Sequence, residues 1–188
     1  MNLIVIEPPA TEPVSVETVK SHLRVDGSAD DALITVYLKS AREVCEGLAR
    51  RAFVTQTLGL VLDGWPALPL EFPRPPLIDV VSITYTDEAG VQHTMSADDY
   101  LVDPYTGRMT LTSGKAWPGE SLSPLSPILV TFTAGYGEAA DVPEMYKTAV
   151  MLLAAHWYEN REVVSDLVRE IPMGVRTLLT HDRERWFK

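Results

Sequence analysis

One stretch decides the fold of this chain: Val142-Pro-Glu-Met-Tyr-Lys-Thr-Ala-Val-Met-Leu-Leu-Ala-Ala-His-Trp-Tyr-Glu-Asn-Arg-Glu162. It predicts a single long helix, because apolar residues recur along it at helical spacing. Pro143 suits the first helical position, and Glu144 places a carboxylate at the positive end of the helix dipole. One face holds Tyr146, Ala149, Val150, Leu153, Ala154 and Trp157, and it is widened by Met145, Met151, Leu152 and His156.

An apolar face this wide exceeds what a single neighbouring element covers. We therefore expect the helix to pack on several neighbours, some of them in other subunits. The polar end of the helix is then expected where subunits meet. The residues predicted at this interface are Tyr158, Asn160, Arg161 and Glu162.

A block rich in β-branched residues, proline and turn residues precedes the long helix. Alternating side chains predict short strands, and hairpin turns such as the one at 88–90 favour an antiparallel sheet. The predicted strands are 55–62, 78–86, 91–95, 100–102, 109–111 and 128–133. Residues 113–127, with two glycines and three prolines, are predicted to form a loop.

Two helices are predicted before this block. Ser15 is a good N-cap for a helix over 16–23, and Ser28 and Asp31 have capping-box spacing at the start of a helix over about 29–51. Residues 1–13 hold a short apolar run followed by three prolines, which predicts an extended arm. A final helix is predicted over about 173–187.

This order of elements predicts an α+β fold, in which the N- and C-terminal helices form a bundle and the antiparallel β block is inserted between them. An insertion keeps both helical segments close in space without a long linker. The expected parts are an N-terminal arm (1–13), the first bundle helices (14–52), the inserted β block (53–137), the last bundle helices (138–180) and a partner-binding tip (181–188).

Composition narrows the class of protein. Of the 188 residues, 46% are hydrophobic, so the chain can bury a real core. A net charge of −10 argues against a nucleic-acid binder held by phosphate contacts, although DNA can slide past an acidic wall. The single cysteine, Cys45, is expected to be a buried thiol in a protein made in a reducing cytosol. Neither a membrane span nor a secretory signal is expected.

Residues able to do chemistry form no recognisable motif. His156 and Glu159 could share a helix face, but a metal site there would need ligands from other helices. The turn at 135–140 matches a dinucleotide fingerprint only superficially, because the strands before it are predicted to be antiparallel. The aspartate pairs at 30–31 and 98–99 are typical of caps and solvated turns. We expect no catalysis, no metal and no cofactor.

The C-terminal tip is basic and aromatic on an otherwise acidic chain. Large aromatic residues at a terminus either fold back on the core or dock into another protein, where aromatics and arginine are the usual anchors. An acidic groove on a partner is the natural complement of such a tip. The predicted partner-binding residues are Arg183, Arg185, Trp186, Phe187 and Lys188.

An ordered set of segments carries a family resemblance. Its most specific member is the helix end Ala155-His-Trp-Tyr-Glu-Asn-Arg-Glu162. The others are 13–27, 30–34, 41–46, 55–57, 62–66, 73–77, 81–85, 133–137, 171–175 and 178–179. Together they resemble the head–tail connector (adaptor or head-completion) proteins of long-tailed bacteriophages and phage-like gene transfer agents, over about residues 13–180.

The resemblance implies a ring, usually of twelve copies, beneath the portal protein at the head–tail junction of a virion or phage-like particle assembled in the bacterial cytoplasm. It implies that double-stranded DNA passes without specific binding, and that the ring is a platform for the next connector, stopper or tail-terminator protein. No catalysis is implied, and the C-terminal segment is expected to reach the portal. A closed ring needs two different contact faces, which the wide apolar helices and the N-terminal arm could supply. We expect the free protein to be monomeric.

Two other functions stay open at this point. A small hydrolase using aspartate or histidine residues would need titratable groups that converge in a cleft, and His156 and Asp103 are the residues to test by alanine substitution. A binding module would hold a peptide or small molecule on the edge of the β block or on the 113–127 loop.

Overall fold

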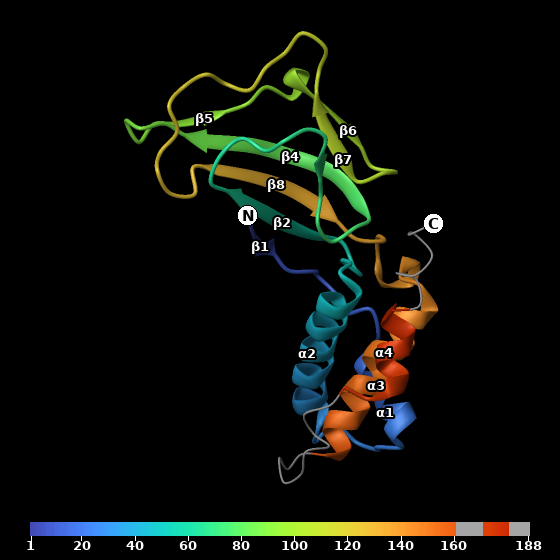
Figure 1. The fold of residues 1–188 in the computed structure, drawn as a ribbon. Coiled ribbons are helices and arrows are strands. Elements are labelled where there is room, and N and C mark those ends of the chain that lie inside the picture. The colour runs from blue at the N-terminus through green and yellow to red at the C-terminus, as the bar shows by residue number, and fades with distance from the viewer. Residues whose placement is uncertain (161–170, 181–188) are drawn as a thin grey trace. The chain divides into compact units, whose positions relative to one another are not determined.

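The computed structural model describes residues 1–160 and 171–180, and the chain divides into two compact units (Figure 1). The sheet unit consists of Met1–Ala10 and Thr55–Gly135, and the helical unit consists of Thr11–Val54 and Tyr136–Lys188. The sheet unit is thus built from two separate segments, with the first helical segment between them in the chain. Helices and antiparallel sheets occur together, so the expected α+β class is confirmed.

The helical unit contains α1 (Val16–Leu23), α2 (Asp31–Ala49), α3 (Glu144–Glu159) and α4 (Met173–Thr180). Local signals fix several of their ends. The Ser15 hydroxyl accepts a hydrogen bond from the Thr18 N–H at 3.2 Å, which caps the start of α1. Arg24 and Arg50 end α1 and α2 in the left-handed region, with φ of 56° and 54°.

The predicted helices agree with α1, α2 and α3 to within three residues at each end. The expected capping box of α2 is wrong, because the N-cap is Asp30 and its side chain makes no capping hydrogen bond. The last predicted helix, over 173–187, corresponds to α4 as far as Thr180, and its remainder lies outside the described residues. None of the described helices has the length and apolarity needed to cross a bilayer.

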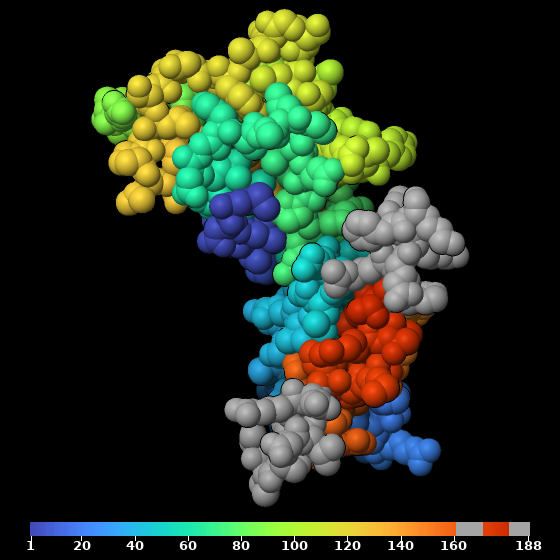
Figure 2. Space-filling model, in the orientation of Figure 1, coloured from blue at the N-terminus to red at the C-terminus, as the bar shows by residue number. Residues whose placement is uncertain are grey.

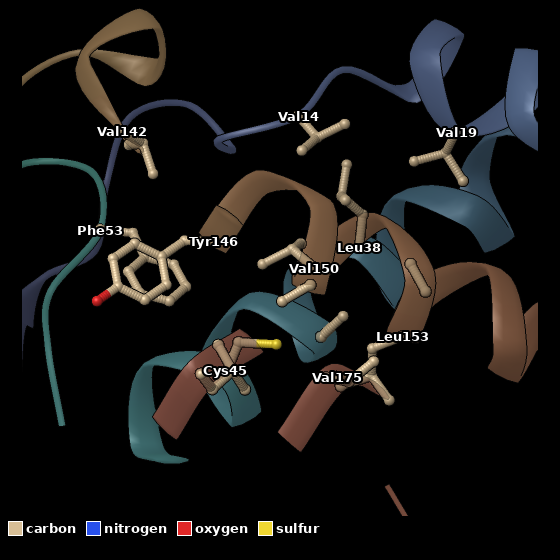
Figure 3. Close-up of a cluster of buried hydrophobic side chains, with 14 of the residues drawn as sticks. Val14, Val19, Leu38, Cys45, Phe53, Val142, Tyr146, Val150, Leu153 and Val175 are labelled. Carbon is tan, nitrogen blue, oxygen red and sulfur yellow. The ribbon is translucent and has the colours of Figure 1, made fainter. Parts of the chain in front are cut away.

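The core of the helical unit gathers around α3, which contacts α1, α2 and α4 (Figure 3). Phe53 stacks on Tyr146 with ring centroids 4.7 Å apart, and both side chains are buried. Buried aliphatic side chains from each described helix complete this core, including Val19, Leu38, Leu153 and Val175. The wide apolar face predicted for α3 is therefore used within the unit, with the half-buried residues Met145, Met151, Leu152 and Trp157 at its margins.

Cys45 lies in this core, as expected (Figure 3). Burial raises the pKa of its thiol to about 12, and the neighbouring Glu46 carboxylate adds to the shift. The thiolate is the reactive form, so it is almost absent at about pH 8. We predict that a disulfide reagent such as DTNB labels the urea-unfolded chain fully and the native chain only as slowly as it unfolds. Equal labelling rates for both would contradict the buried position.

The sheet unit contains two sheets. The larger has the order β1 (Asn2–Glu7), β2 (Gln56–Leu62), β8 (Ile128–Ala134), β4 (Leu77–Thr86) and β5 (Gln92–Thr94). The smaller has the order β3 (Leu70–Glu71), β7 (Arg108–Leu111) and β6 (Tyr100–Asp103). All described pairings are antiparallel, as expected, and the predicted strands agree with β2 and β4 to β8 to within one residue at each end.

The two faces of the larger sheet differ. Along β8, Ile128, Val130, Phe132 and Ala134 are buried, and the residues between them are half-buried. Phe132 packs on Phe72, which follows β3, with ring centroids 4.9 Å apart. The face that carries Phe132 is therefore the core of the sheet unit. We call it the inner face, and the opposite face of the larger sheet the outer face.

The N-terminal segment requires a correction. Residues 1–13 were expected to form an extended arm, but Asn2–Glu7 pair with β2 as the edge strand β1 of the larger sheet (Figure 1). The short apolar run at the N-terminus is extended, as expected, because it adds a strand to the free edge of β2. Of this segment, only the residues from Thr11 onward belong to the helical unit.

Candidate functional site

The predicted subunit interface begins at the end of α3. The Tyr158 hydroxyl donates a hydrogen bond to Asp30 Oδ2, which ties α3 to the N-cap of α2. The side-chain amide of Asn160 donates to the His156 carbonyl oxygen at 2.8 Å, and its backbone N–H donates to the same oxygen at 3.0 Å. Tyr158 thus connects two helices and Asn160 caps the end of α3, and the contact of both residues with another subunit stays a prediction.

The predicted partner-binding tip follows α4. Val175 and Leu179 of α4 are buried in the core of the helical unit, so α4 is held by this core. Seven of the predicted site residues lie outside the described part of the chain. They are Arg161 and Glu162 of the predicted interface, and Arg183, Arg185, Trp186, Phe187 and Lys188 of the tip.

A buried ion-pair network lies in the helical unit. Arg42 Nε donates to Glu12 Oε2 at 2.8 Å, and Arg42 Nη1 donates to Glu46 Oε2 at 3.0 Å. Glu46 Oε1 accepts the Phe53 N–H at 2.8 Å, and the Phe53 carbonyl oxygen accepts the Tyr136 N–H at 2.8 Å. Glu12, Phe53 and Tyr136 each lie within two residues of a point where the chain passes between the units. The network therefore holds the three segments at which the chain enters or leaves the helical unit.

A row of aromatic rings holds the long loop of the sheet unit. Trp117 stacks on Trp65 with centroids 4.7 Å apart, and Trp65 meets the edge of Tyr85 at 5.3 Å. Tyr85 stacks in turn on His93 at 5.0 Å. The Trp117 indole N–H donates to the Pro66 carbonyl oxygen at 3.2 Å. The predicted loop over 113–127 is thus attached to the sheet through Trp117.

Hydrogen bonds surround the His93 end of this row. His93 Nε2 lies 2.8 Å from Asp87 Oδ2, and this hydrogen bond is the main reason why the pKa of Asp87 is lowered. The Val91 N–H adds to the effect by donating to Asp87 at 2.9 Å. Burial, and then the Glu120 carboxylate, raise the pKa of Tyr85. These carboxylates stabilise a turn and a loop.

The acidic residues considered for catalysis lie in ion pairs and turns. Asp31 Oδ1 pairs with Lys20 Nζ at 2.6 Å, and Asp99 Oδ1 pairs with Lys115 Nζ at 2.5 Å. Across residues 1–160 and 171–180, no group of three or more His, Cys, Asp or Glu side chains could hold a metal ion. These ion pairs therefore connect neighbouring segments of the chain.

Asp103 and His156, the residues named for a hydrolase, belong to different units. Asp103 organises the turn between β6 and β7, where its carboxylate accepts the Thr106 hydroxyl at 2.6 Å and the Tyr105 N–H at 3.0 Å. The Thr106 hydrogen bond is the main reason why the pKa of Asp103 is lowered. An ionised turn carboxylate of this kind stabilises the hairpin.

The glycine turn before α3 has a backbone role. Gly135 and Gly137 have φ of 137° and 129°, which side-chain-bearing residues rarely adopt. A Cβ at Gly137 would lie 2.5 Å from Asp141 Oδ2, which accepts the Glu138 N–H at 2.9 Å. A carboxylate of the chain therefore occupies this turn, in place of the phosphate that a dinucleotide fingerprint would bind.

Comparison with known proteins gives one family and several solved structures. Residues 13–93 match the family model described as phage gp6-like head-tail connector protein. None of the curated proteins matches the chain significantly.

Three of the similar structures are chains from gene transfer agent (GTA) particles. One comes from the neck of an empty GTA particle computed with C6 symmetry, with 27% identity, a TM-score of 0.78, and coverage of 99% of this chain and 95% of that one. Another comes from the neck of a native GTA particle computed with C12 symmetry, with 26% identity, a TM-score of 0.76, and coverage of 99% and 94%. A third, from the virion of a native GTA particle, has 28% identity, a TM-score of 0.74, and coverage of 99% and 95%.

Proposed function

We propose that this chain is the adaptor that forms a ring beneath the portal protein, because residues 13–93 match the model of phage gp6-like head-tail connector proteins, the family that the sequence resembles. In this role it lets DNA pass and provides a docking platform for the next connector or tail protein. The observation that carries the proposal is the likeness over 99% of the chain to a chain of a particle neck. The family and these neighbours are structural parts of particles, so the proposed role is assembly and not catalysis.

The proposed ring has twelve copies. The similar chains come from necks computed with C6 and C12 symmetry, and both symmetries are compatible with a twelve-membered ring. Such a ring closes by head-to-tail contacts between two different faces of each subunit. We propose that the free protein is monomeric and that the ring forms on the portal. A tight oligomer in analytical ultracentrifugation at low concentration would contradict this part of the proposal.

The proposed passage for DNA follows from charge. The chain has 26 acidic and 16 basic residues, and a ring of twelve such chains is strongly acidic. An acidic wall repels the phosphate backbone, so DNA can move through the ring without being held. Specific DNA binding is not part of the proposed function.

The proposed contact with the portal is the tip that follows α4. Its residues are Arg183, Arg185, Trp186, Phe187 and Lys188, which together offer positive charge and two large aromatic anchors. The proposed partner on the other side of the ring is the next connector, a stopper or tail-terminator protein.

Deletion of residues 181–188 tests this contact. We predict that the shortened chain folds, because the buried anchors Val175 and Leu179 of α4 are retained, but that it no longer joins filled heads to tails. The measurements are thermal unfolding of the purified chain, and the counts of tailed and tailless heads in electron micrographs. Met173→Ser is the control, because Met173 is 83% exposed on α4 and is expected to leave the counts unchanged. Normal numbers of tailed particles with the shortened chain would contradict a portal contact through the tip.

A further inference from the structure

The outer face of the larger sheet carries cross-strand rows of small, uncharged side chains. The register places Ile4, Gly59, Thr131 and Ser82 in one row. The next row contains Asn2, Val61, Leu129, Thr84 and Thr94. Apart from Gly59, these residues are half-buried or exposed, so the described residues of the sheet unit leave this face largely uncovered.

Gly59 makes the apolar part of this face continuous. A Cβ at this position would lie 2.9 Å from Ile4 Cγ1, 2.9 Å from Leu129 Cδ1 and 3.0 Å from Ile6 Cδ1. Three apolar side chains from β1 and β8 therefore meet above the glycine of β2. Ile4 and Ile6 remain 39% and 41% exposed, although they make these contacts. Figure 2 shows the N-terminal residues, in dark blue, on the surface of the sheet unit.

Among the paired residues of the outer face, the carboxylates lie at one end. The row that contains Thr57 and Thr133 ends in Glu7 on β1 and Asp79 on β4. The two rows described above contain no charged residue. An uncharged area of this extent is notable in a chain with 26 acidic residues and a net charge of −10.

We propose that the outer face, centred on Ile4, Gly59 and Leu129, is a contact surface for the neighbouring copy of this chain. The inference rests on the proposed ring. Copies of a protein with net charge −10 repel each other overall, and a face without carboxylates lowers this repulsion where two copies meet. The centre of a protein interface is depleted of charge, as this face is. Ring closure makes the contact head-to-tail, so the neighbour presents a different surface to it.

The proposal is tested by placing a charge in the outer face and letting this variant compete with the wild-type chain for incorporation into particles. Thr131→Glu adds a carboxylate at the centre of the rows, and Thr110→Glu makes the same change on exposed β7 of the smaller sheet. Each variant is expressed together with the wild-type chain, and the ratio of the two chains in purified particles is measured by mass spectrometry. For Thr131→Glu, we expect the ratio of variant to wild-type chain in particles to fall about tenfold or more, because the interface would bury a carboxylate without a partner. For Thr110→Glu, we expect this ratio to stay near the ratio at which the two chains are expressed. Equal incorporation of both variants would overturn the proposal.

A crosslink identifies the occupant and does not depend on how Thr131→Glu folds. Thr131→Cys introduces a thiol on the face, and the native Cys45 is buried and unreactive. A thiol-reactive photo-crosslinker on assembled particles should give a covalent dimer that contains only this chain. A product with the portal or a tail protein would overturn the proposal, as would the absence of any product from particles that contain the chain. If particles did not contain the wild-type chain at all, this result would instead contradict the proposed ring, and the contact proposed here would fall with it.

Discussion

Replacing Arg42 by methionine is expected to lower the free energy of unfolding by about 3–5 kcal/mol. The Arg42 side chain is 3% exposed and pairs with Glu46, which is 4% exposed, and with Glu12. Methionine fills much of the same space but removes the hydrogen bonds that Arg42 donates to Glu46 and Glu12. Removing one partner of a buried ion pair costs far more than the pair itself contributes to stability. Urea unfolding followed by circular dichroism measures the difference.

The control is the same substitution in an exposed pair. Arg108 Nη2 lies 2.7 Å from Glu71 Oε1, closer than the distances in the Arg42 pairs, but the two side chains are 51% and 67% exposed. Arg108→Met is expected to cost about 0–1 kcal/mol, because solvent screens an exposed pair. Similar losses for both variants would show that burial does not govern the Arg42 network.

Replacing Tyr146 by alanine is expected to cost about 3–5 kcal/mol, as for large aromatic side chains in other cores. Tyr146 is 1% exposed, and its ring lies between Phe53 at 4.7 Å and Tyr136 at 5.9 Å. Its loss would open a cavity in the helical unit, between α3 and the segments that contain Phe53 and Tyr136. The measurement is again urea unfolding of the purified chain.

Tyr105→Ala removes the same ring from the surface. Tyr105 is 100% exposed in the turn between β6 and β7. It is expected to change stability by less than about 0.5 kcal/mol. A loss of the same size in the two tyrosine variants would contradict the account of the helical core.

Elements encoded by local signals could be predicted from the sequence. Ser15 caps α1, and Pro143 directly precedes the first turn of α3, because these effects depend only on neighbours within a few residues. The strand β4 could be placed from its alternation for the same reason.

Features that depend on distant pairing could not be predicted. β1 pairs with a strand more than fifty positions away, and nothing within 1–13 shows that the edge of β2 is open. The contact of Trp65 with Trp117 likewise joins two loops. Arg42 and Glu46 have visible i,i+4 spacing, but such pairs usually face solvent, so their burial depends on the segments that cover them.

The candidate contact surfaces also differ in whether local sequence signals could reveal them. The sequence singled out Tyr158 and Asn160 as polar residues at a helix end, and the structure gives both of them partners in the helical unit. The uncharged outer face could not be found from sequence, because it appears only when the register places Gly59 beside Thr131 and Ile4. A surface made by three strands is a property of their pairing.

The central proposal is that this chain forms a ring that joins heads to tails, and that its role is assembly. Electron microscopy of particles from cells that lack the chain tests it most directly, with the wild-type gene restored as the control. The account predicts DNA-filled heads without tails, beside separate tails of normal length. Tailed particles in wild-type numbers would contradict it.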